Sequence, residues 1–103
     1  MIDVTLKRKN NNAVGFSVKG HADFAEEGSD IVCSAVSILA YTTVNTLDLY
    51  IDNLKFSDDG DKMNLEIEES TDQTDIIFKF FETGIQALLE NYNEYVNLDY
   101  EEV

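Results

Sequence analysis

Tryptophan and proline are absent from this 103-residue sequence, and histidine and cysteine occur once each, as His21 and Cys33. A single cysteine excludes a disulfide within the chain, and one cysteine with one histidine cannot supply the four ligands of a structural zinc site. The sequence contains no other obvious metal site, so we expect the protein to need no metal or other cofactor.

A long uninterrupted apolar run is also missing. The N-terminal residues MIDVTLKRKN alternate between apolar and polar side chains, unlike a signal peptide. The most apolar stretch, residues 31–51, is interrupted by Ser, Thr, Asn and Asp, and we expect it to be too polar to span a bilayer. These features favour a soluble cytoplasmic protein that is not inserted in a membrane.

Basic residues are scarce, since seven Lys and Arg stand against 21 Asp and Glu and the formal net charge is −14. Acidic residues crowd between positions 58 and 75 and again at the C-terminus. Such a surface repels nucleic-acid phosphate and anionic lipid, which argues against direct DNA or RNA binding, and it attracts a basic partner. The same charge also fits a purely solubilising role, so both interpretations stay open.

The patterning favours a single domain built from two hairpins and two helices. Apolar residues alternate with polar ones over residues 2–6 and 14–18, which predicts a hairpin, and residues 54–67 predict a second one. Residues 20–28 show no clear period and are expected to form a loop with a glycine at each end. Residues 95–100 alternate again and suggest a last strand.

Helical spacing appears twice. From residue 31 to about residue 53 the apolar positions fall near one face, with Ser29 or Asp30 suited to the N-cap. A capping box at Ser70 and Gln73 is expected to open a second helix, in which Gly84 allows close packing against a neighbour. The predicted apolar positions are Val32, Val36, Leu39, Thr43, Leu47, Tyr50 and Leu54 in the first helix, and Ile77, Phe80, Phe81, Ile85, Leu88 and Tyr92 in the second.

The element order ββαββα(β) predicts an α+β two-layer sandwich, with an antiparallel or mixed sheet and both helices on one face. In this arrangement Cys33 would lie in the first helical turn, near unpaired backbone N–H groups that favour a thiolate and can hold an oxyanion. Ser37 and Ala40 would share its side of the helix. If the preceding loop folds back, His21 could take the thiol proton, with Asp23 or Asp30 orienting its ring.

Other interpretations of these residues remain open. A cysteine in an apolar helix usually packs as a small core residue, a loop histidine is usually solvated, and Ser37 suits a packing position. A non-catalytic acidic module that binds a basic partner would fit the charge. A redox-sensing thiol is a third possibility, although the chain has no resolving cysteine.

The segment GHADFAEEGSDIVCSAVSIL resembles the signature of the ribosomal-processing cysteine protease (Prp, YsxB-like) family. That signature has Gly-His-Ala after the second strand, a glycine-containing loop, and Asp-Ile-Val-Cys-x-Ala-Val-Ser at the helix start. This sequence contains all of these elements, and Gly-Ile-Gln-Ala-Leu in the second helix resembles a weaker family pattern. Asn93 stands where many relatives carry a proline. The matching residues are Gly20, His21, Ala22, Gly28, Asp30, Ile31, Val32, Cys33, Ala35, Val36 and Ser37.

The resemblance implies that residues 1–103 form one protease domain with the family fold. It implies a cysteine endopeptidase that removes the N-terminal extension of large-subunit ribosomal protein twenty-seven, a basic substrate, during ribosome maturation. Cys33 would be the nucleophile and His21 the general base and acid. Asp30 and Ser37 would be supporting positions, and Gly20 and Gly28 would bound the loop that orders over the substrate. The resemblance also implies a homodimer. For the alternative of a non-catalytic acidic module, it implies a basic ribosomal or ribosome-assembly partner.

Overall fold

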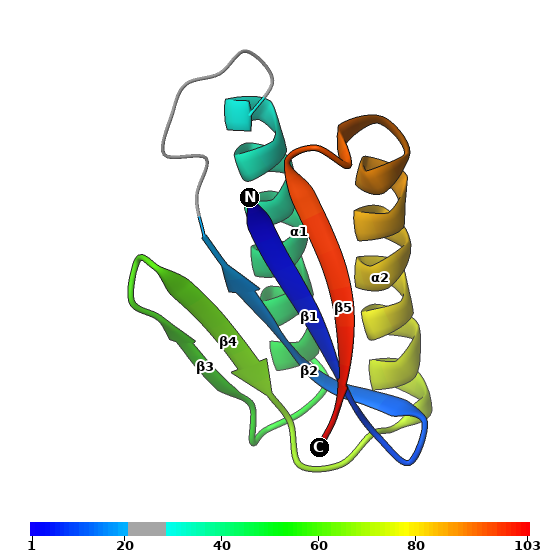
Figure 1. Ribbon diagram of the computed structural model, residues 1–103. Coiled ribbons are helices and arrows are strands. Elements are labelled where there is room, and N and C mark those ends of the chain that lie inside the picture. The colour runs from blue at the N-terminus through cyan, green and yellow to red at the C-terminus, as the bar shows by residue number, and fades with distance from the viewer. Residues whose placement is uncertain (21–28) are drawn as a thin grey trace.

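Over residues 1–20 and 29–103, which the computed structural model describes, the chain forms five strands and two helices (Figure 1). Their order confirms the predicted ββαββαβ sequence of elements. The elements are β1 (Ile2–Lys9), β2 (Asn12–Lys19), α1 (Ser29–Asp48), β3 (Lys55–Asp58), β4 (Lys62–Glu66), α2 (Asp72–Tyr92) and β5 (Val96–Glu102).

The strands form one open, mixed sheet in the order β3-β4-β2-β1-β5. The pairs β1–β2, β2–β4 and β3–β4 are antiparallel, whereas β5 runs parallel to β1 after the crossover through α2. Both helices lie behind the sheet in the view of Figure 1. The two-layer α+β fold predicted from the sequence is therefore confirmed.

The β1–β2 hairpin closes through a two-residue turn, Asn10–Asn11. Both asparagines have positive φ angles, 53° and 68°, and Lys9 pairs with Asn12 across the turn. Two consecutive residues of positive φ are typical of the type I′ turn, whose twist matches that of the flanking strands. Asparagine adopts this conformation at lower cost than most residues, so the Asn-rich stretch explains the tight turn.

The core lies between the sheet and the two helices. The rings of Phe16 and Phe81 stack with centroids 4.3 Å apart, joining β2 to α2. A Cβ atom at Gly84 would lie 2.6 Å from a methyl carbon of Leu39, so glycine lets α2 approach α1 closely, as the sequence predicted. The residues of α1 buried in this core are Val32, Val36, Ala40, Thr43, Val44 and Leu47.

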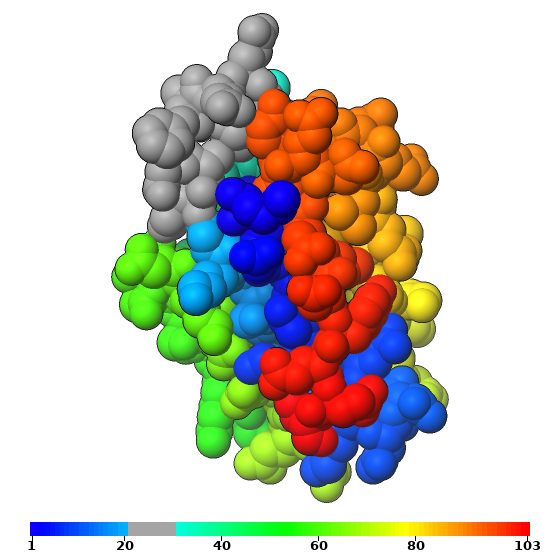
Figure 2. Space-filling view, in the orientation of Figure 1, coloured from blue at the N-terminus to red at the C-terminus, as the bar shows by residue number. Residues whose placement is uncertain are grey.

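The opposite face of the sheet carries polar side chains, and Figure 2 views the molecule from this side. Lys7 on β1 donates to Asn64 Oδ1 at 2.6 Å and to Glu66 Oε1 at 3.0 Å, both on β4. The lysine hydrogen bond holds the pKa of Glu66 below its usual range. On β1 the apolar residues Ile2, Val4 and Leu6 are thus buried against the core, whereas Lys7 lies on the outer face with its partners on β4.

The boundaries of α1 differ from the prediction. The helix begins at Ser29, so the expected capping residues 29 and 30 lie inside it, and it ends at Asp48 rather than near residue 53. The N–H groups of Leu49 and Tyr50 bond to carbonyls three residues earlier, at 3.1 and 2.9 Å, and these tighter bonds close the last turn. Tyr50 and Leu54, which the pattern assigned to the helix, therefore follow it.

The N-cap of α2 is Thr71, which lies one residue after the predicted cap, Ser70. The capping box is formed by Thr71 and Thr74, whose hydroxyls accept from each other's backbone N–H, rather than by Ser70 and Gln73. A threonine at the fourth box position is outside the usual pattern of Glu or Gln, which explains the shift. Phe80, predicted to be in the core, is 66% exposed, and Phe78 is buried in its place.

By length and composition alone, Ile31–Asp48 could cross a membrane, so the polar residues within it argue less strongly against a membrane span than expected. In the structure, this apolar helix is part of the core of the protein. Val32, Val36 and Ala40 are buried between α1 and the sheet, as in the core helix of a globular domain.

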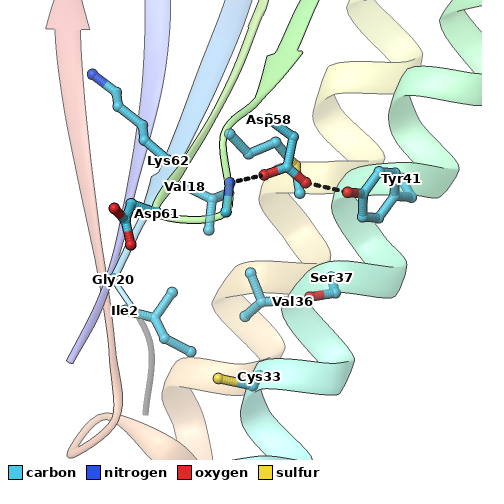
Figure 3. Close-up of a pocket in the computed structure, with 12 residues that line it drawn as sticks. Ile2, Val18, Gly20, Cys33, Val36, Ser37, Tyr41, Asp58, Asp61 and Lys62 are labelled. Atoms are coloured by element: carbon cyan, nitrogen blue, oxygen red, sulfur yellow. Dashed lines mark hydrogen bonds between the residues drawn. The ribbon is translucent and has the colours of Figure 1, made fainter. Parts of the chain in front are cut away.

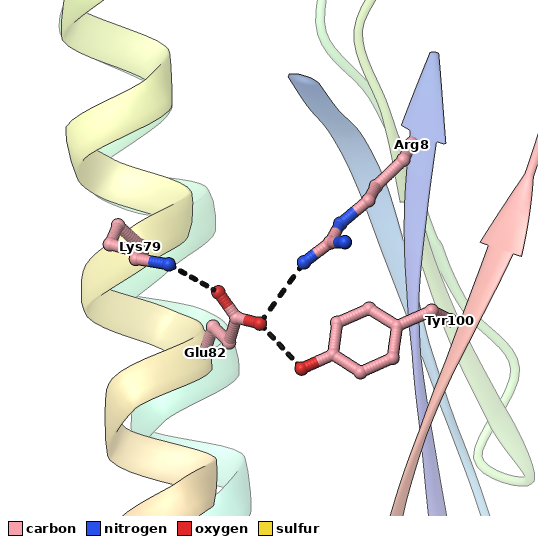
Figure 4. A network of polar contacts seen from close by, with 4 residues as sticks. All are labelled: Arg8, Lys79, Glu82 and Tyr100. Carbon is pink, nitrogen blue, oxygen red and sulfur yellow. Dashed lines mark hydrogen bonds and ion pairs between the residues drawn. The ribbon is translucent and has the colours of Figure 1, made fainter. Parts of the chain in front are cut away.

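A charged network joins α2 to the far end of β1 and β5 (Figure 4). Glu82 is only 5% exposed and accepts from Arg8 and Lys79, both at 3.2 Å, and from the Tyr100 hydroxyl. The Arg8 guanidinium lies 4.3 Å from the centroid of the Tyr100 ring. Burial alone would raise the pKa of Glu82, but the Tyr100 and Lys79 hydrogen bonds outweigh it and hold that pKa below its usual range.

We predict that Glu82→Gln lowers the free energy of unfolding by about 1.5–3 kcal/mol, the usual worth of hydrogen bonds to a charged group. Because the folded-state pKa of Glu82 is lowered, its contribution is present above the unfolded pKa of about 4.3 and is lost as the pH falls through the folded pKa. Urea unfolding followed by circular dichroism, at neutral and acidic pH, measures both effects.

Glu90→Gln is the matched control, because Glu90 is an exposed residue of the same helix. It should leave the unfolding free energy nearly unchanged. A Glu82→Gln variant as stable as the wild type at neutral pH would contradict a stabilising role for the network.

Candidate active site

A cavity of about 230 Å³ opens between α1, the ends of β1 and β2, and the β3–β4 turn. Its apolar lining includes Ile2, Val18 and Met63, while Ser37 and Asp61 are among its polar residues (Figure 3). The volume is below the range of roughly 300–1,000 Å³ of pockets that enclose whole drug-sized ligands. The cavity therefore suits one or two side chains of a larger ligand.

Cys33 lies on the wall of this cavity and is half-buried. It is the fifth residue of α1, because the helix begins at Ser29, and it therefore lies just beyond the first turn in which it was predicted. Side chains on a helix tilt toward its N-terminus, so the sulfur still lies over the first turn. In Figure 3 the sulfur points from the helix toward Ile2 on β1.

Ser37 and Tyr41 extend this line along α1, four and eight residues after Cys33. Residues four apart share one side of a helix, and all three line the cavity. Ser37 is exposed and Tyr41 is 41% exposed, so this side of α1 forms the margin of the core. Ala40, which was expected on the same side as Cys33, is fully buried in the core instead.

The β3–β4 turn forms the opposite wall and is held by its own carboxylates. Asp58 Oδ1 accepts from the Gly60 N–H at 3.0 Å, and Asp59 Oδ1 accepts from the N–H groups of Lys62 and Asp61, at 2.8 and 2.9 Å. The backbone donors, that of Lys62 above all, hold the pKa of Asp59 below its usual range. The acidic side chains of this turn thus fix its backbone.

A side-chain hydrogen bond joins Asp58, at the start of this turn, to α1. The Tyr41 hydroxyl donates to Asp58 Oδ2, and this bond raises the pKa of Tyr41. The Tyr41 ring also contacts Phe56 of β3 edge-on, with centroids 5.9 Å apart and an interplanar angle of 71°. Tyr41 therefore joins α1 to both β3 and the turn that follows it.

Gly20 marks the point where the chain leaves β2 at the edge of the cavity. Its N–H donates to the carbonyl of Asp61 at 3.2 Å, and its φ angle is +95°. A Cβ atom here would lie 2.5 Å from the carbonyl oxygen of Met1. Both the backbone conformation and the close contact require glycine, which explains this part of the motif physically.

Three of the predicted site residues cannot be compared with this geometry. His21 and Gly28 lie outside the described residues, as does the side chain of Asp30, whose backbone forms the second position of α1. Of the predicted set, the structure brings together Gly20, Cys33 and Ser37 around one cavity. The pairing of His21 with Cys33 stays a prediction.

Tyr41 and the β3–β4 turn were not predicted as parts of the site. The spacing of Cys33, Ser37 and Tyr41 was a usable signal, because residues at i, i+4 and i+8 share a helix face. The acidic residues at the turn were interpreted only as surface charge. Nothing local to residues 58–61 indicates that they face the cysteine, since that depends on the pairing of β4 with β2.

Comparison with known proteins places this site in context. The family model described as cysteine protease Prp matches residues 1–97. The ribosomal processing cysteine protease Prp of Bacillus subtilis is 33% identical over 76 residues, covering 70% of this chain and 68% of that protein. A crystal structure of a Streptococcus mutans protein has 32% identity and a TM-score of 0.84, covering 100% of this chain and 99% of that one.

A second similar structure is that of the essential ribosomal processing protease Prp of Staphylococcus aureus, which was crystallised with a substrate peptide. Its sequence identity is 25% and its TM-score is 0.82, with 98% of this chain and 100% of that chain covered. The similarity therefore extends over the whole fold and includes the elements that form the cavity.

We predict that Gly20→Ala lowers the free energy of unfolding by about 1–3 kcal/mol, the usual cost of an unfavourable backbone conformation. The steric contact with Met1 should add to this cost. Gly60→Ala is the matched control, since Gly60 has a φ angle of +92° but no atom within 4 Å of the position that a Cβ would take. Urea denaturation of both variants measures the difference, and equal losses would show that the contact with Met1 contributes nothing.

Proposed function

Because the chain belongs to the cysteine protease Prp family, we propose that Cys33 is the nucleophile of its peptide-bond hydrolysis and His21 the general base and acid. The observation that supports this role best is the position of Cys33. Its side chain lies at the start of a helix, half-buried, on the wall of a cavity open to a peptide. Asp30 and Ser37 are proposed as supporting residues, and Gly20 and Gly28 as the ends of the substrate loop.

The proposed reaction proceeds in two steps. His21 takes the thiol proton, and the Cys33 sulfur attacks the carbonyl carbon of the scissile peptide bond. Backbone N–H groups in the first turn of α1, which have no partner within the helix, stabilise the oxyanion that forms. The C–N bond breaks as His21 protonates the leaving amine. Water then hydrolyses the thioester, which releases the second product and restores the thiol.

The proposed substrate is the N-terminal extension of large-subunit ribosomal protein twenty-seven, cleaved in the cytoplasm during ribosome maturation. The names of the relatives support ribosomal processing, and the Staphylococcus aureus structure contains a substrate peptide. The charge of this chain supports a basic substrate, because a net charge of −14 attracts cations. At the cavity itself, Asp58 and Asp61 outweigh the charge of Lys62. Direct binding of nucleic acid is disfavoured by the same charge.

We predict that Cys33→Ala and His21→Ala each abolish cleavage of a protein carrying this extension while the fold stays intact. Cys33→Ser should also be severely impaired, because a serine hydroxyl at this position stays protonated. Cleavage is followed by mass spectrometry of the products, and the fold by circular dichroism. Ser34→Ala, a change at the exposed neighbour of Cys33, is the control and should cleave normally. Wild-type rates in either alanine variant of the proposed pair would refute the assignment.

We also propose that the protein is a homodimer that associates through the outer face of α1. Between Ile31 and Leu47 this helix has no charged residue, although the chain carries 28 charged side chains, seven basic and 21 acidic. Ile31 and Ile38, seven residues apart on the outer face, are 63% and 68% exposed. A strongly acidic chain repels its own copy, so an uncharged apolar face offers a favourable contact between two copies.

Ile38→Glu should therefore convert the dimer to a monomer, because each copy would bury a carboxylate against the other. Size-exclusion chromatography with light scattering measures the mass directly. Gln73→Glu adds the same charge at an exposed position of α2 and should leave the dimer intact. A wild-type protein that is monomeric at micromolar concentration would overturn this proposal.

A further inference from the structure

We propose that Tyr41 is a positioning residue that holds the β3–β4 turn against α1 through its hydrogen bond to Asp58, and that this contact sets the affinity for the substrate. The inference rests on the proposed function, because it concerns the cavity beside Cys33. It assigns no chemical step to Tyr41. The contact would act by keeping two walls of the cavity at a fixed separation.

Tyr41 occupies a position from which it reaches both walls. It lies two helical turns after Cys33 on the same side of α1, and both residues line the cavity. Its ring packs against Phe56 of β3. Its hydroxyl donates to Asp58, as Figure 3 shows. Tyr41 thus contacts two parts of the same hairpin, Phe56 through its apolar ring and Asp58 through its polar hydroxyl.

Asp58 connects this hydroxyl to the backbone of the turn. Its Oδ2 accepts from Tyr41 and its Oδ1 accepts from the Gly60 N–H, so one carboxylate links the helix to the turn. The carbonyl of Asp61, in the same turn, accepts from the N–H of Gly20. The hydroxyl of Tyr41 is therefore connected, through the turn, to the point where the chain leaves β2.

The contact between Tyr41 and Asp58 is expected to affect substrate binding without affecting overall stability, because it is exposed. Tyr41 and Asp58 are both exposed, and solvent-exposed polar contacts contribute little to the free energy of unfolding. The bond instead restricts an exposed turn at the edge of the sheet, which is where local opening is easiest. Loss of the bond should consequently change substrate binding more than it changes either unfolding or the chemistry at Cys33.

The test is a double-mutant cycle in a peptide-cleavage assay. Tyr41→Phe keeps the ring against Phe56 and removes only the donor, so KM should rise about two- to tenfold, the range expected for one hydrogen bond, with kcat within about twofold. In the background of Asp58→Ala, the same change should alter KM by less than about twofold, because the partner is already absent. Tyr50→Phe removes a hydroxyl outside the cavity and should have no effect.

Three results would overturn the inference. Tyr41→Phe could leave KM unchanged, lower kcat alone, or raise KM equally in the wild-type and Asp58→Ala backgrounds. The last result would mean that the tyrosine acts without the carboxylate. Unfolding curves of Tyr41→Phe, expected to coincide with those of the wild type, separate a positioning role from general destabilisation.

A binding measurement distinguishes failure of this inference from failure of the proposed function. The probe is a synthetic peptide that spans the extension of ribosomal protein twenty-seven, titrated calorimetrically into Cys33→Ala with and without Tyr41→Phe. The added change should weaken binding by the same factor as it raises KM. A peptide that binds but is not cleaved by the wild type refutes only the proposed function. A peptide that the wild type cleaves, but that binds Cys33→Ala equally well with and without Tyr41→Phe, refutes only this inference.

Discussion

The packing of α1 in the core determines where the site can form. Val32, Val36 and Ala40 are buried at intervals of four residues in the core that α1 shares with the sheet and α2, and this burial fixes the rotation of the helix about its axis. With that rotation fixed, the adjacent line of side chains that begins at Cys33 lies at the border between core and solvent. A cysteine one position earlier would be enclosed in the core, and one position later it would face solvent. The half-buried state of the thiol thus follows from apolar residues that take no part in chemistry.

The acidic residues of the β3–β4 turn have two roles. Its carboxylates contribute to the charge of the protein, yet Asp58 and Asp59 also accept hydrogen bonds from backbone N–H groups of their own turn. A turn without such acceptors would leave those N–H groups to water and would be less ordered. Asp58, which lines the cavity, thus adds a negative charge to its wall and also helps to hold the backbone of the turn in place.

Much of the architecture was predictable because the patterns are local. Alternation indicated the strands, helical spacing indicated the two helices, and Gly84 marked their close approach. The sheet order and the parallel pairing of β5 with β1 were not predictable, because strand partners are chosen by tertiary packing. Helix ends were displaced by one to five residues for a related reason. The cap of α2 is formed by a pair of threonines. Phe78, rather than the predicted Phe80, lies in the core because of the way in which the helix packs on the sheet. At the site, the motif indicated Cys33 directly, whereas the opposite wall required the pairing of distant strands.

The open sheet has a consequence for behaviour at high concentration. Its two outermost strands present unpaired backbone groups, which in many proteins template the growth of fibrils and amorphous aggregates. Here β3 is only four residues long, and β5 ends in a run that includes Asp99, Glu101 and Glu102. A short strand and a negatively charged strand are both poor templates for pairing with a further chain. The protein is thereby suited to remain dispersed in a crowded solution while it handles extended peptides, which themselves tend to pair with exposed strands.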